Sequence, residues 1–340
     1  MTAVIESGVG HVWQIKQAAA GTVEPTGSTY KHLRKVGDKA MKAAKTYGSE
    51  EWVDGQQFGS PGHYVDTIGG DVGGFMFQAQ PETAGFAFAQ IIGVDTVTGA
   101  SDPYTHTISS GTANGPLQTV RAKAGSAVLW RQAWYDAIVN KLTFNCGQDQ
   151  KVAHIDQDFM ALKAGAWATA DPSAADSGTD PFNWAEVTGA LTIDATAIPE
   201  LDGETVEIDR KWDVHRGDSP APICFVPGKG EINRTFSGLV TDTTIDIMQS
   251  ILFGSTTPAA NDPVTSVVAD VALVSTYTRS ADRTLSITTP KVIVNPADFE
   301  VFPRAEGGKI PVAFGGRCVK DGSTAALTIV AKTADSASYV

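Results

Sequence analysis

The chain has 340 residues, a formal net charge of −12, 42% hydrophobic residues and 8% aromatic residues. This length is roughly twice that of a typical domain of about 150 residues, so we expect two globular units with packed cores. Thr, Val, Ala, Gly and Pro outnumber the strong helix formers, which favours a mainly β chain of short strands and turns. The acidic balance repels polyanions and argues against a general nucleic-acid-binding protein.

Three widely spaced cysteines, Cys146, Cys224 and Cys318, form no CxxC pair and no disulfide framework. The first residues lack a basic start followed by an apolar core, and no run of about 18 apolar residues occurs. We therefore expect a soluble protein with reduced thiols that uses no classical export signal and makes no membrane contact.

A basic run at residues 31–45 stands out from its acidic surroundings. Residues 1–165 carry 13 basic and 15 acidic residues, and residues 166–340 carry 13 and 23. A basic helix on nucleic acid is one interpretation, but no aromatic residue interleaves with the charges. A solvated face, or a patch that docks onto an acidic neighbouring subunit, is favoured.

The two halves repeat one order of features at an offset near 160 residues. Residues 63–77 and 222–236 each read as strand, glycine turn and strand. Residues 81–93 and 242–254 each read as a helix that closes on a glycine, the second one capped by Asp242. Each half then returns to strands and ends in a hairpin, with turns at 147–150 and 306–309. We interpret this order as a tandem duplication of a β-rich domain.

The predicted domain boundaries follow from this repeat. An N-terminal arm covers residues 1–25, the first domain 26–166, a linker or insertion 167–199, and the second domain 200–340. The linker contains an Asp-, Ser-, Gly- and Pro-rich segment at 171–183. The final residues, TADSASYV, are small and polar, and we expect a mobile tail.

The inventory of reactive side chains predicts no catalytic residue, no metal site and no cofactor. The histidines show no metal-ligand spacing, and neither a GxSxG elbow nor a phosphate-binding loop is present. Cys146 and His154 are the nearest approach to a thiol nucleophile with a base, which makes a hydrolase the weakest hypothesis. Glu204 and Glu207 alternate with apolar residues and are interpreted as the wet face of a strand.

The residues 142–157 predict a hairpin. Leu142, Phe144 and Cys146 fall on one strand face, which makes Cys146 one more small core residue. After the turn at 147–150, Ala153 and Ile155 share a face of the partner strand, and His154 falls on the opposite face.

The order of these features resembles the tail tube proteins of long-tailed, siphovirus-type bacteriophages. The resemblance lies in DGQQFGSPGHYVDTIGGDVGGFMF (54–77), a helix ending in IIG, THTI (105–108) and VNKLTF (139–144). One departure is that Cys146 follows this last strand, whereas the family's cysteine precedes it, which leaves the hairpin register open.

The resemblance implies a fold and a function. The fold is two tandem, duplicated tail-tube-like β-sandwich or barrel domains, each with one flanking α-helix. The function is that of a non-enzymatic virion protein that self-assembles into stacked rings, forming the channel through which DNA is ejected. The chain then resides in the virion tail, and in the host cytoplasm during assembly.

The implied partners are further copies of the chain and other tail proteins: the tape measure, the tail terminator and the distal tail protein. Rings of three chains with pseudo-sixfold symmetry, or of six chains, are both open. DNA passes transiently without specific binding. The two hairpins are the candidate assembly sites, through Leu142, Phe144, Gln148, Asp149, Lys151, Glu306 and Lys309.

A two-domain β-rich surface or carbohydrate-binding module is the alternative function. It requires an aromatic platform, for which Trp130, Trp134 and Tyr135 are the nearest candidates. Strand and loop packing is the simpler interpretation of these three side chains.

Overall fold

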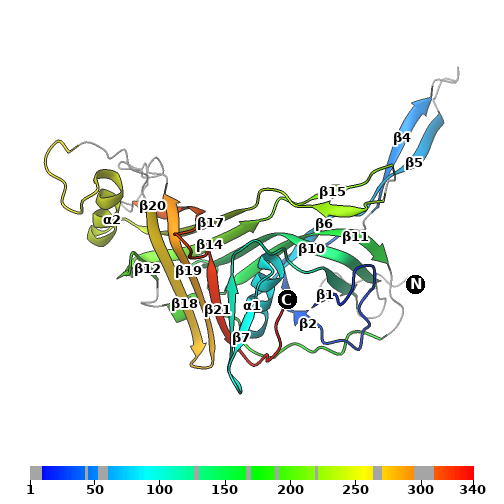
Figure 1. The fold of residues 1–340 in the computed structure, drawn as a ribbon, viewed down its shortest axis with the longest axis horizontal. Helices are drawn as coiled ribbons and strands as arrows, with labels where there is room; N and C mark the ends of the chain where they lie inside the picture. Colours follow the sequence, from blue (N-terminus) through cyan, green and yellow to red (C-terminus); the bar gives the residue numbers. More distant parts are fainter. Residues whose placement is uncertain are drawn as a thin grey trace.

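The computed structural model describes residues 10–42, 45–52, 60–125, 130–165, 170–187, 191–218, 221–262, 270–294 and 310–340, with the backbone alone for 45–52 and 60–68. The described chain is mainly β and contains two α-helices, as the composition and the helix signals predicted (Figure 1). Neither helix is long and apolar enough to cross a membrane.

We call residues 10–165 the first half. Its elements in chain order are β1 (Gly10–Lys16), β2 (Lys31–Leu33), β3 (Lys35–Val36), β4 (Lys45–Trp52), β5 (Ser60–Ile68), β6 (Gly70–Gln78), α1 (Pro81–Ile92), β7 (Thr96–Thr98), β8 (Tyr104–Ser109), β9 (Gln118–Ala124), β10 (Trp130–Gly147) and β11 (His154–Gly165).

Residues 170–187 form a segment that we call the strap, which ends in a short 3-10 helix at Trp184–Val187. We call residues 191–340 the second half. Its elements are β12 (Thr192–Ile193), β13 (Thr196–Ala197), β14 (Leu201–Asp209), β15 (Asp213–His215), β16 (Cys224–Val226), β17 (Glu231–Leu239), α2 (Asp242–Phe253), β18 (Asp270–Ser280), β19 (Arg283–Val294), β20 (Pro311–Cys318) and β21 (Thr328–Thr333).

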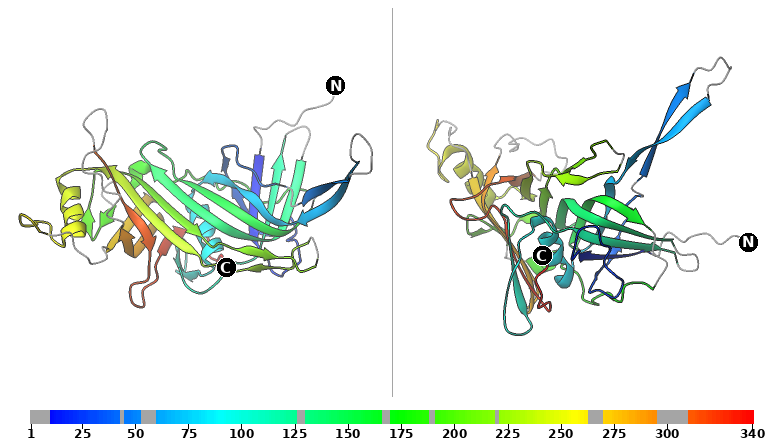
Figure 2. Two further views of the ribbon diagram at one scale, coloured as in Figure 1. Left: turned by 90° about the horizontal axis from the view of Figure 1, so that it is seen from above. Right: turned by 45° about the vertical axis from the view of Figure 1, so that its right-hand side comes forward.

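A single antiparallel sheet runs through both halves in the order β6, β11, β10, β14, β17, β20, and we call it the shared sheet. Its members run side by side across the middle of the molecule (Figure 2). The strands β1 and β9 continue from the first part of β10. In the second half, β19 pairs with β18, β20 and β21. On its other edge, β21 pairs with β8, a strand of the first half.

The two helices have matching ends. Gln80 caps α1, with Pro81 at its first position, and Gly93 ends it in the left-handed conformation at φ 82°. Thr241 caps α2 through a hydrogen bond from the Thr244 backbone, and Gly254 ends it at φ 73°. The two C-terminal glycines were predicted, but the cap of the second helix is Thr241 and not Asp242, which is its first helical residue.

Each half has a hairpin immediately before the long strand that leads to its helix. In the first half, β4 and β5 pair with each other over eight to nine residues and project beyond the body (Figure 1). In the second half, β15 and β16 pair over three residues. This shorter hairpin lies against the first half, because Arg216 Nη2 donates to the carbonyl oxygen of Gly69 at 3.0 Å.

The strand registers of the two halves correspond. Phe77 on β6 pairs with Ile155 on β11, and Phe236 on β17 pairs with Phe314 on β20. A shift of 159 residues on both strands converts the first pair into the second. All four side chains are fully buried, so the same pleat faces a core in each half.

One hydrophobic cluster extends through both halves. Phe144 on β10 packs against Phe88 on α1, at a ring-centroid distance of 6.0 Å, and against Tyr277 on β18 at 5.5 Å. A helix and two strands from different halves therefore meet at one aromatic side chain.

The strap and the C-terminal tail are both held against the body. Phe182 of the strap is fully buried, its N–H donates to the carbonyl oxygen of Ala79, and its carbonyl oxygen accepts from the N–H of Ala153. Tyr339 of the tail is 5% exposed and stacks on His106. The expectation of a mobile tail was wrong, because its only large side chain is an aromatic anchor.

Candidate functional site: the shared sheet and the contacts between the halves

The first predicted hairpin forms with its turn where the sequence placed it. Leu142 and Phe144 are fully buried and face the core. Gln148, Asp149 and Lys151 are exposed around the turn, with Lys151 at φ 59°. The structure therefore separates these five candidate residues into two core side chains and three at a surface turn. Glu306 and Lys309, the candidates of the second hairpin, lie outside the described residues.

The hairpin connects the two halves through the edge of β10. Seven residue pairs join β10 to β14, from Lys141 with Asp209 to Gly147 with Gly203. Beyond the strand, the N–H of Gln148 donates to the carbonyl oxygen of Asp202 at 2.8 Å. Asn145 has partners on both sides, His154 on β11 and Thr205 on β14. Backbone hydrogen bonds therefore make one sheet of two sequence-distant segments.

The face of the shared sheet that points away from the core is polar. It carries Thr143, Asn145, Asp156, Asp158, Thr205, Glu207, Asp209, Asn233, Thr235 and Arg317, all at least partly exposed. Lys39 lies 2.8 Å from Asp156 and 2.7 Å from Asp158, and Lys141 lies 2.8 Å from Glu207. The acidic groups are thus only partly balanced, which leaves a surface with little attraction for phosphate.

Cys146 and His154 do not form a reactive pair. Cys146 faces the core with 1% exposure, and burial, followed by the nearby charge of Glu204, raises the pKa of its thiol to about 12. His154 lies on the opposite pleat of the adjacent strand. A thiol nucleophile needs a lowered pKa and a base within hydrogen-bond reach, and the geometry provides neither.

The three candidate aromatics do not form one platform. Trp130 is 60% exposed, whereas Trp134 is 2% exposed and its Nε1 donates to the carbonyl oxygen of Lys42. Tyr135 points to the other face of β10 because it follows Trp134 directly. A sugar-binding platform requires adjacent exposed rings, and these side chains lack that arrangement.

Glu204 was wrongly interpreted as part of a wet strand face. It has the same strand parity as Val206 and Ile208, and all three are buried. Glu204 accepts hydrogen bonds from Arg234 and Ser275 through Oε1 and from Tyr277 through Oε2. Glu207, one residue out of phase, does lie on the exposed face. The strand parity alone could have revealed this difference.

The basic run at 31–45 forms short strands in its described part and pairs with acids of its own chain. Lys31 pairs with Asp335 in the tail and Arg34 with Asp176 in the strap. Burial alone would raise the pKa of Asp176, but hydrogen bonds from Arg34 and Gln80 hold it at about 2. Through these ion pairs, the basic run holds the tail and the strap against the first half.

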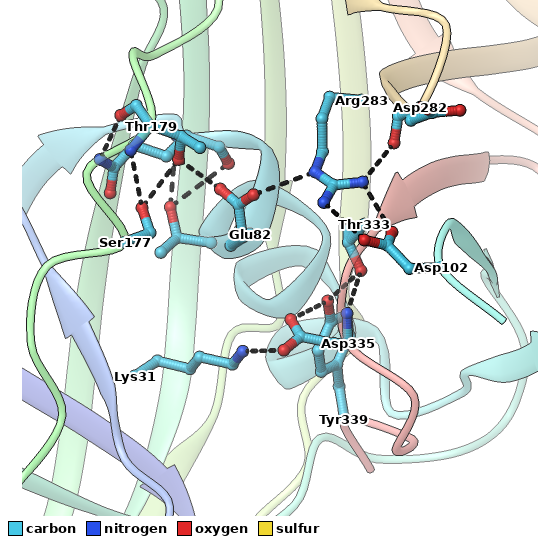
Figure 3. Close-up of polar contacts among 12 residues, drawn as sticks. Lys31, Glu82, Asp102, Ser177, Thr179, Asp282, Arg283, Thr333, Asp335 and Tyr339 are labelled. Carbon is cyan, nitrogen blue, oxygen red and sulfur yellow. Dashed lines mark hydrogen bonds and ion pairs between the residues drawn. The ribbon is translucent and has the colours of Figure 1, made fainter.

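A polar network ties together four segments that are distant in the sequence (Figure 3). Arg283, at the start of β19, lies 3.2 Å from Glu82 on α1 and 2.9 Å from Asp102, next to β8. Thr179 of the strap also donates to Glu82. Lys31 and Asp335 form a separate ion pair in the same view. Glu82, the only charged residue of α1, is therefore held by Arg283 of the second half and by Thr179 of the strap.

His106 anchors the tail from inside the fold. Its Nδ1 lies 3.0 Å from Asp95 Oδ2, and its Nε2 lies 2.9 Å from the carbonyl oxygen of Asp335. Both partners accept hydrogen bonds only, so the ring must carry two protons to satisfy both. Burial would lower the pKa of His106, but the hydrogen bonds to Asp95 and to the Asp335 carbonyl raise it. His106 in its doubly protonated form therefore holds the tail through both hydrogen bonds.

The fold and these surfaces define a mainly β structural protein. Strand pairing and ion pairs join segments of it that are distant in the sequence. No group of three or more metal-binding side chains occurs among the described residues. A family model described as phage tail tube protein matches residues 10–301. The chain therefore belongs to the phage tail tube protein family, whose members are structural components of the virion tail. No curated protein matches the chain.

Proposed function

We propose that this chain is a tail tube subunit that self-assembles into stacked rings, and that the shared sheet forms the inner wall of the channel through which DNA is ejected. The observation that carries the proposal is the pairing of β10 with β14. This pairing joins the first-half strands β6, β11 and β10 to the second-half strands β14, β17 and β20. The pair β6–β11 and the pair β17–β20 have the same register. Repetition of this joint from chain to chain would extend the sheet around a ring.

The ends of the shared sheet support this proposal. Within the described residues, β20 pairs with β17 along Pro311–Arg317 but has β19 as a second neighbour only at Gly316–Cys318. At the other end, β3 pairs with β6 at Phe77 and Met76, and backbone hydrogen bonds with Arg34 and Lys42 cover Gln78 and Val72, so only a short stretch of the β6 edge between these contacts is open. Open strand edges invite pairing with another chain, and a ring uses both edges of every copy.

The polar face of the shared sheet supports a role as the lining of the channel. A wall rich in Lys and Arg would bind phosphate and release counterions, which would hold the DNA. The face described above instead carries mainly hydroxyl, amide and carboxylate groups, with Arg317 as a basic group among them and part of the acid neutralised by Lys39 and Lys141. DNA would pass such a wall without specific binding.

The repeat favours a ring of three chains with pseudo-sixfold symmetry over a ring of six chains. The proposal includes a tandem duplication, with a first domain at 26–166 and a second at 200–340. It also includes a siphovirus-type tail, contacts with the tape measure, tail terminator and distal tail proteins, and assembly in the host cytoplasm. The proposed role is structural and involves no catalysis.

Negative-stain electron microscopy of the purified full chain tests the proposal. We expect rings or tubes with a central channel, and class averages with threefold symmetry and six similar lobes. Monomers at every concentration and salt condition would refute self-assembly. Sixfold averages with twelve lobes would retain the tube and reject the three-chain ring.

A further inference from the structure

The two helices are equivalent in length and end structure but differ in how they are covered. Each spans twelve residues between an extended cap and a left-handed glycine, and a shift of 161 residues superimposes Pro81–Ile92 on Asp242–Phe253. Every residue of α1 except Glu82 is buried. In α2 only Thr244, Met248 and Ile251 are buried. The second helix therefore lacks a cover that the first one has.

Part of the cover of α1 comes from the second half. The helix contacts β10 on one side and β8, β19 and β21 on the other. The packing is tight at Gly85, where an added Cβ would come within 2.8 Å of Ala331 Cβ on β21 and within 3.5 Å of the Tyr339 ring. Arg283 on β19 binds Glu82 at the N-terminal end. This helix thus fills the space between its own half and the next one.

The corresponding face of α2 is open. Ile245 is 37% exposed, whereas Ala84, its counterpart in α1, is fully buried. Leu252 and Phe253 are only partly buried, and their counterparts in α1 are 1% and 3% exposed. The same side of α2 carries Asp242 and Asp246, both exposed. The open face therefore combines the apolar side chains Ile245, Leu252 and Phe253 with two carboxylates.

The first half has a groove of matching chemistry. It has a volume of about 790 Å³ and lies between β1, β9 and β10 on one side and residues 35–41 with β6 on the other. Apolar side chains line it, namely Val12, Met41, Phe75, Ala122, Trp130 and Trp134. Trp130 is the most exposed of them at 60%. Lys35, Lys123, His11 and Asp38 also line the groove, and because Lys123 pairs with Asp171, Lys35 is the basic group opposite in sign to the carboxylates of α2.

The order of elements along the molecule relates the helix to the groove. Along the long axis, α2 is followed by β18, β19 and β21, then by α1, and then by β1 and β2 (Figures 1 and 2). Helix and strand group alternate, and α1 occupies the place between the second half and the first. Continuation of this alternation into another copy places a helix beside the free side of the first half.

We propose that α2 of one copy seats its open face in the groove of the first half of a neighbouring copy, in the way that α1 seats against the second half within the chain. This inference rests on the proposed ring. It adds a side-chain interface to the backbone pairing of strand edges, and it names the two surfaces that meet. Ile245 and Phe253 contact the groove, and Asp242 and Asp246 face Lys35.

Cross-linking between differently tagged full-length chains tests this contact directly. Both chains carry Cys224→Ser, which removes the exposed native thiol, while Cys146 and Cys318 stay buried. One chain carries Ile245→Cys and the other Ala124→Cys, at the groove. We expect a short bis-maleimide to link the two chains only when they are mixed and allowed to assemble. The matched control replaces Ala124→Cys by Thr98→Cys, an exposed position on β7, and should give no link.

A second variant tests whether the open face of α2 stabilises the assembled ring. Ile245→Asp should lower the yield of rings at least about tenfold, because it places an unpaired carboxylate in an apolar groove. Ile223→Asp makes the same chemical change at a residue that is 60% exposed on the β15–β16 hairpin, and should leave the yield within about twofold. The melting temperature of the unassembled chain should be unchanged in both variants, since neither side chain is buried.

The outcomes separate the two proposals. Rings of normal yield with Ile245→Asp, or assembled rings without the Ile245–Ala124 link, would overturn the helix-in-groove contact and leave the tail tube assembly intact. A wild-type chain that never forms rings would overturn both.

Discussion

Arg234 donates hydrogen bonds from Nε and Nη2 to the same oxygen of Glu204, at 2.9 and 2.7 Å, and both side chains are completely buried. The remaining donors of Arg234 reach the Leu273 carbonyl, Thr289 and Ser275. A buried ion pair is stable in a fold only when such additional partners satisfy both groups. This pair therefore fixes how the shared sheet packs on β18 and β19.

Loss of one member of this pair should destabilise the chain strongly. Glu204→Gln should lower the free energy of unfolding by about 3–5 kcal/mol, because it leaves the buried guanidinium without its counter-charge. The measurement is urea denaturation followed by circular dichroism. Glu207→Gln is the matched control three residues along the same strand, where the partly exposed pair with Lys141 should contribute at most about 1 kcal/mol. Equal effects of the two substitutions would contradict the assignment.

The anchoring of the tail by His106 should depend on pH. The pKa of His106 is raised in the folded chain, so its contribution to stability is complete below the unfolded pKa near 6.5 and is lost as pH rises through the higher folded value. The Tyr339 N–H, which donates to Asp95, should then exchange faster with solvent at alkaline pH, beyond the intrinsic acceleration. Hydrogen exchange with mass spectrometry measures this change.

His106→Gln provides the control for this pH dependence. The substitution should remove the pH-dependent part of the exchange and expose the tail at all pH values, at a cost of about 1.5–3 kcal/mol for hydrogen bonds to a charged group. His154→Gln, on the polar face of β11, should leave the pH dependence of the tail unchanged. A tail that responds to pH equally in both variants would rule out His106 as its anchor.

The three thiols should differ in reactivity. Burial raises the pKa of Cys146 and of Cys318 to about 12, and both are buried, whereas Cys224 is exposed. Iodoacetamide at neutral pH should therefore label Cys224 in the native chain and the other two only after denaturation. Peptide mass spectrometry reads out each site. Native labelling of Cys146 at the rate of Cys224 would show that the first hairpin opens and would revive a chemical role for its thiol.

The helix-ending glycines offer a matched pair of substitutions. Gly93 and Gly254 have nearly the same left-handed backbone, so alanine strains both by about 1 kcal/mol. A Cβ at Gly93 would also press on the carbonyl oxygen of Asn114, whereas Gly254 has open space around it. Gly93→Ala should therefore lower the melting temperature clearly more than Gly254→Ala, as measured by calorimetry. Equal shifts would contradict the tight packing of α1.

Local patterns predicted the local elements. Pro81 and Gly93 bound the first helix, and Gly254 ends the second, because backbone conformation at these positions depends on the residue itself. Alternation placed Leu142, Phe144 and Cys146 on a core face for the same reason. The family resemblance rested on the order of such elements, and the match over residues 10–301 confirms it.

These local patterns did not predict which distant segments pair or pack with one another. The sequence does not reveal that β8 pairs with β21, more than 200 residues away, or that the strap closes over Ala79. Glu204 and Glu207 were both assigned to a wet strand face from their alternation with apolar residues, although Glu204 differs from Glu207 in strand parity and in having Arg234 within reach. The tail was judged by its small polar residues, although Tyr339 decides its position through His106.

The sequence by itself determined a mainly β chain, its two capped helices, the first hairpin and its membership of the tail tube family, since these depend on residue type and short-range periodicity. The tertiary structure alone decided that β10 and β14 unite the halves in one sheet, and that one helix is covered while its counterpart is open. Those features arise from backbone hydrogen bonds and packing between segments that are distant along the chain, and no local pattern encodes such partners.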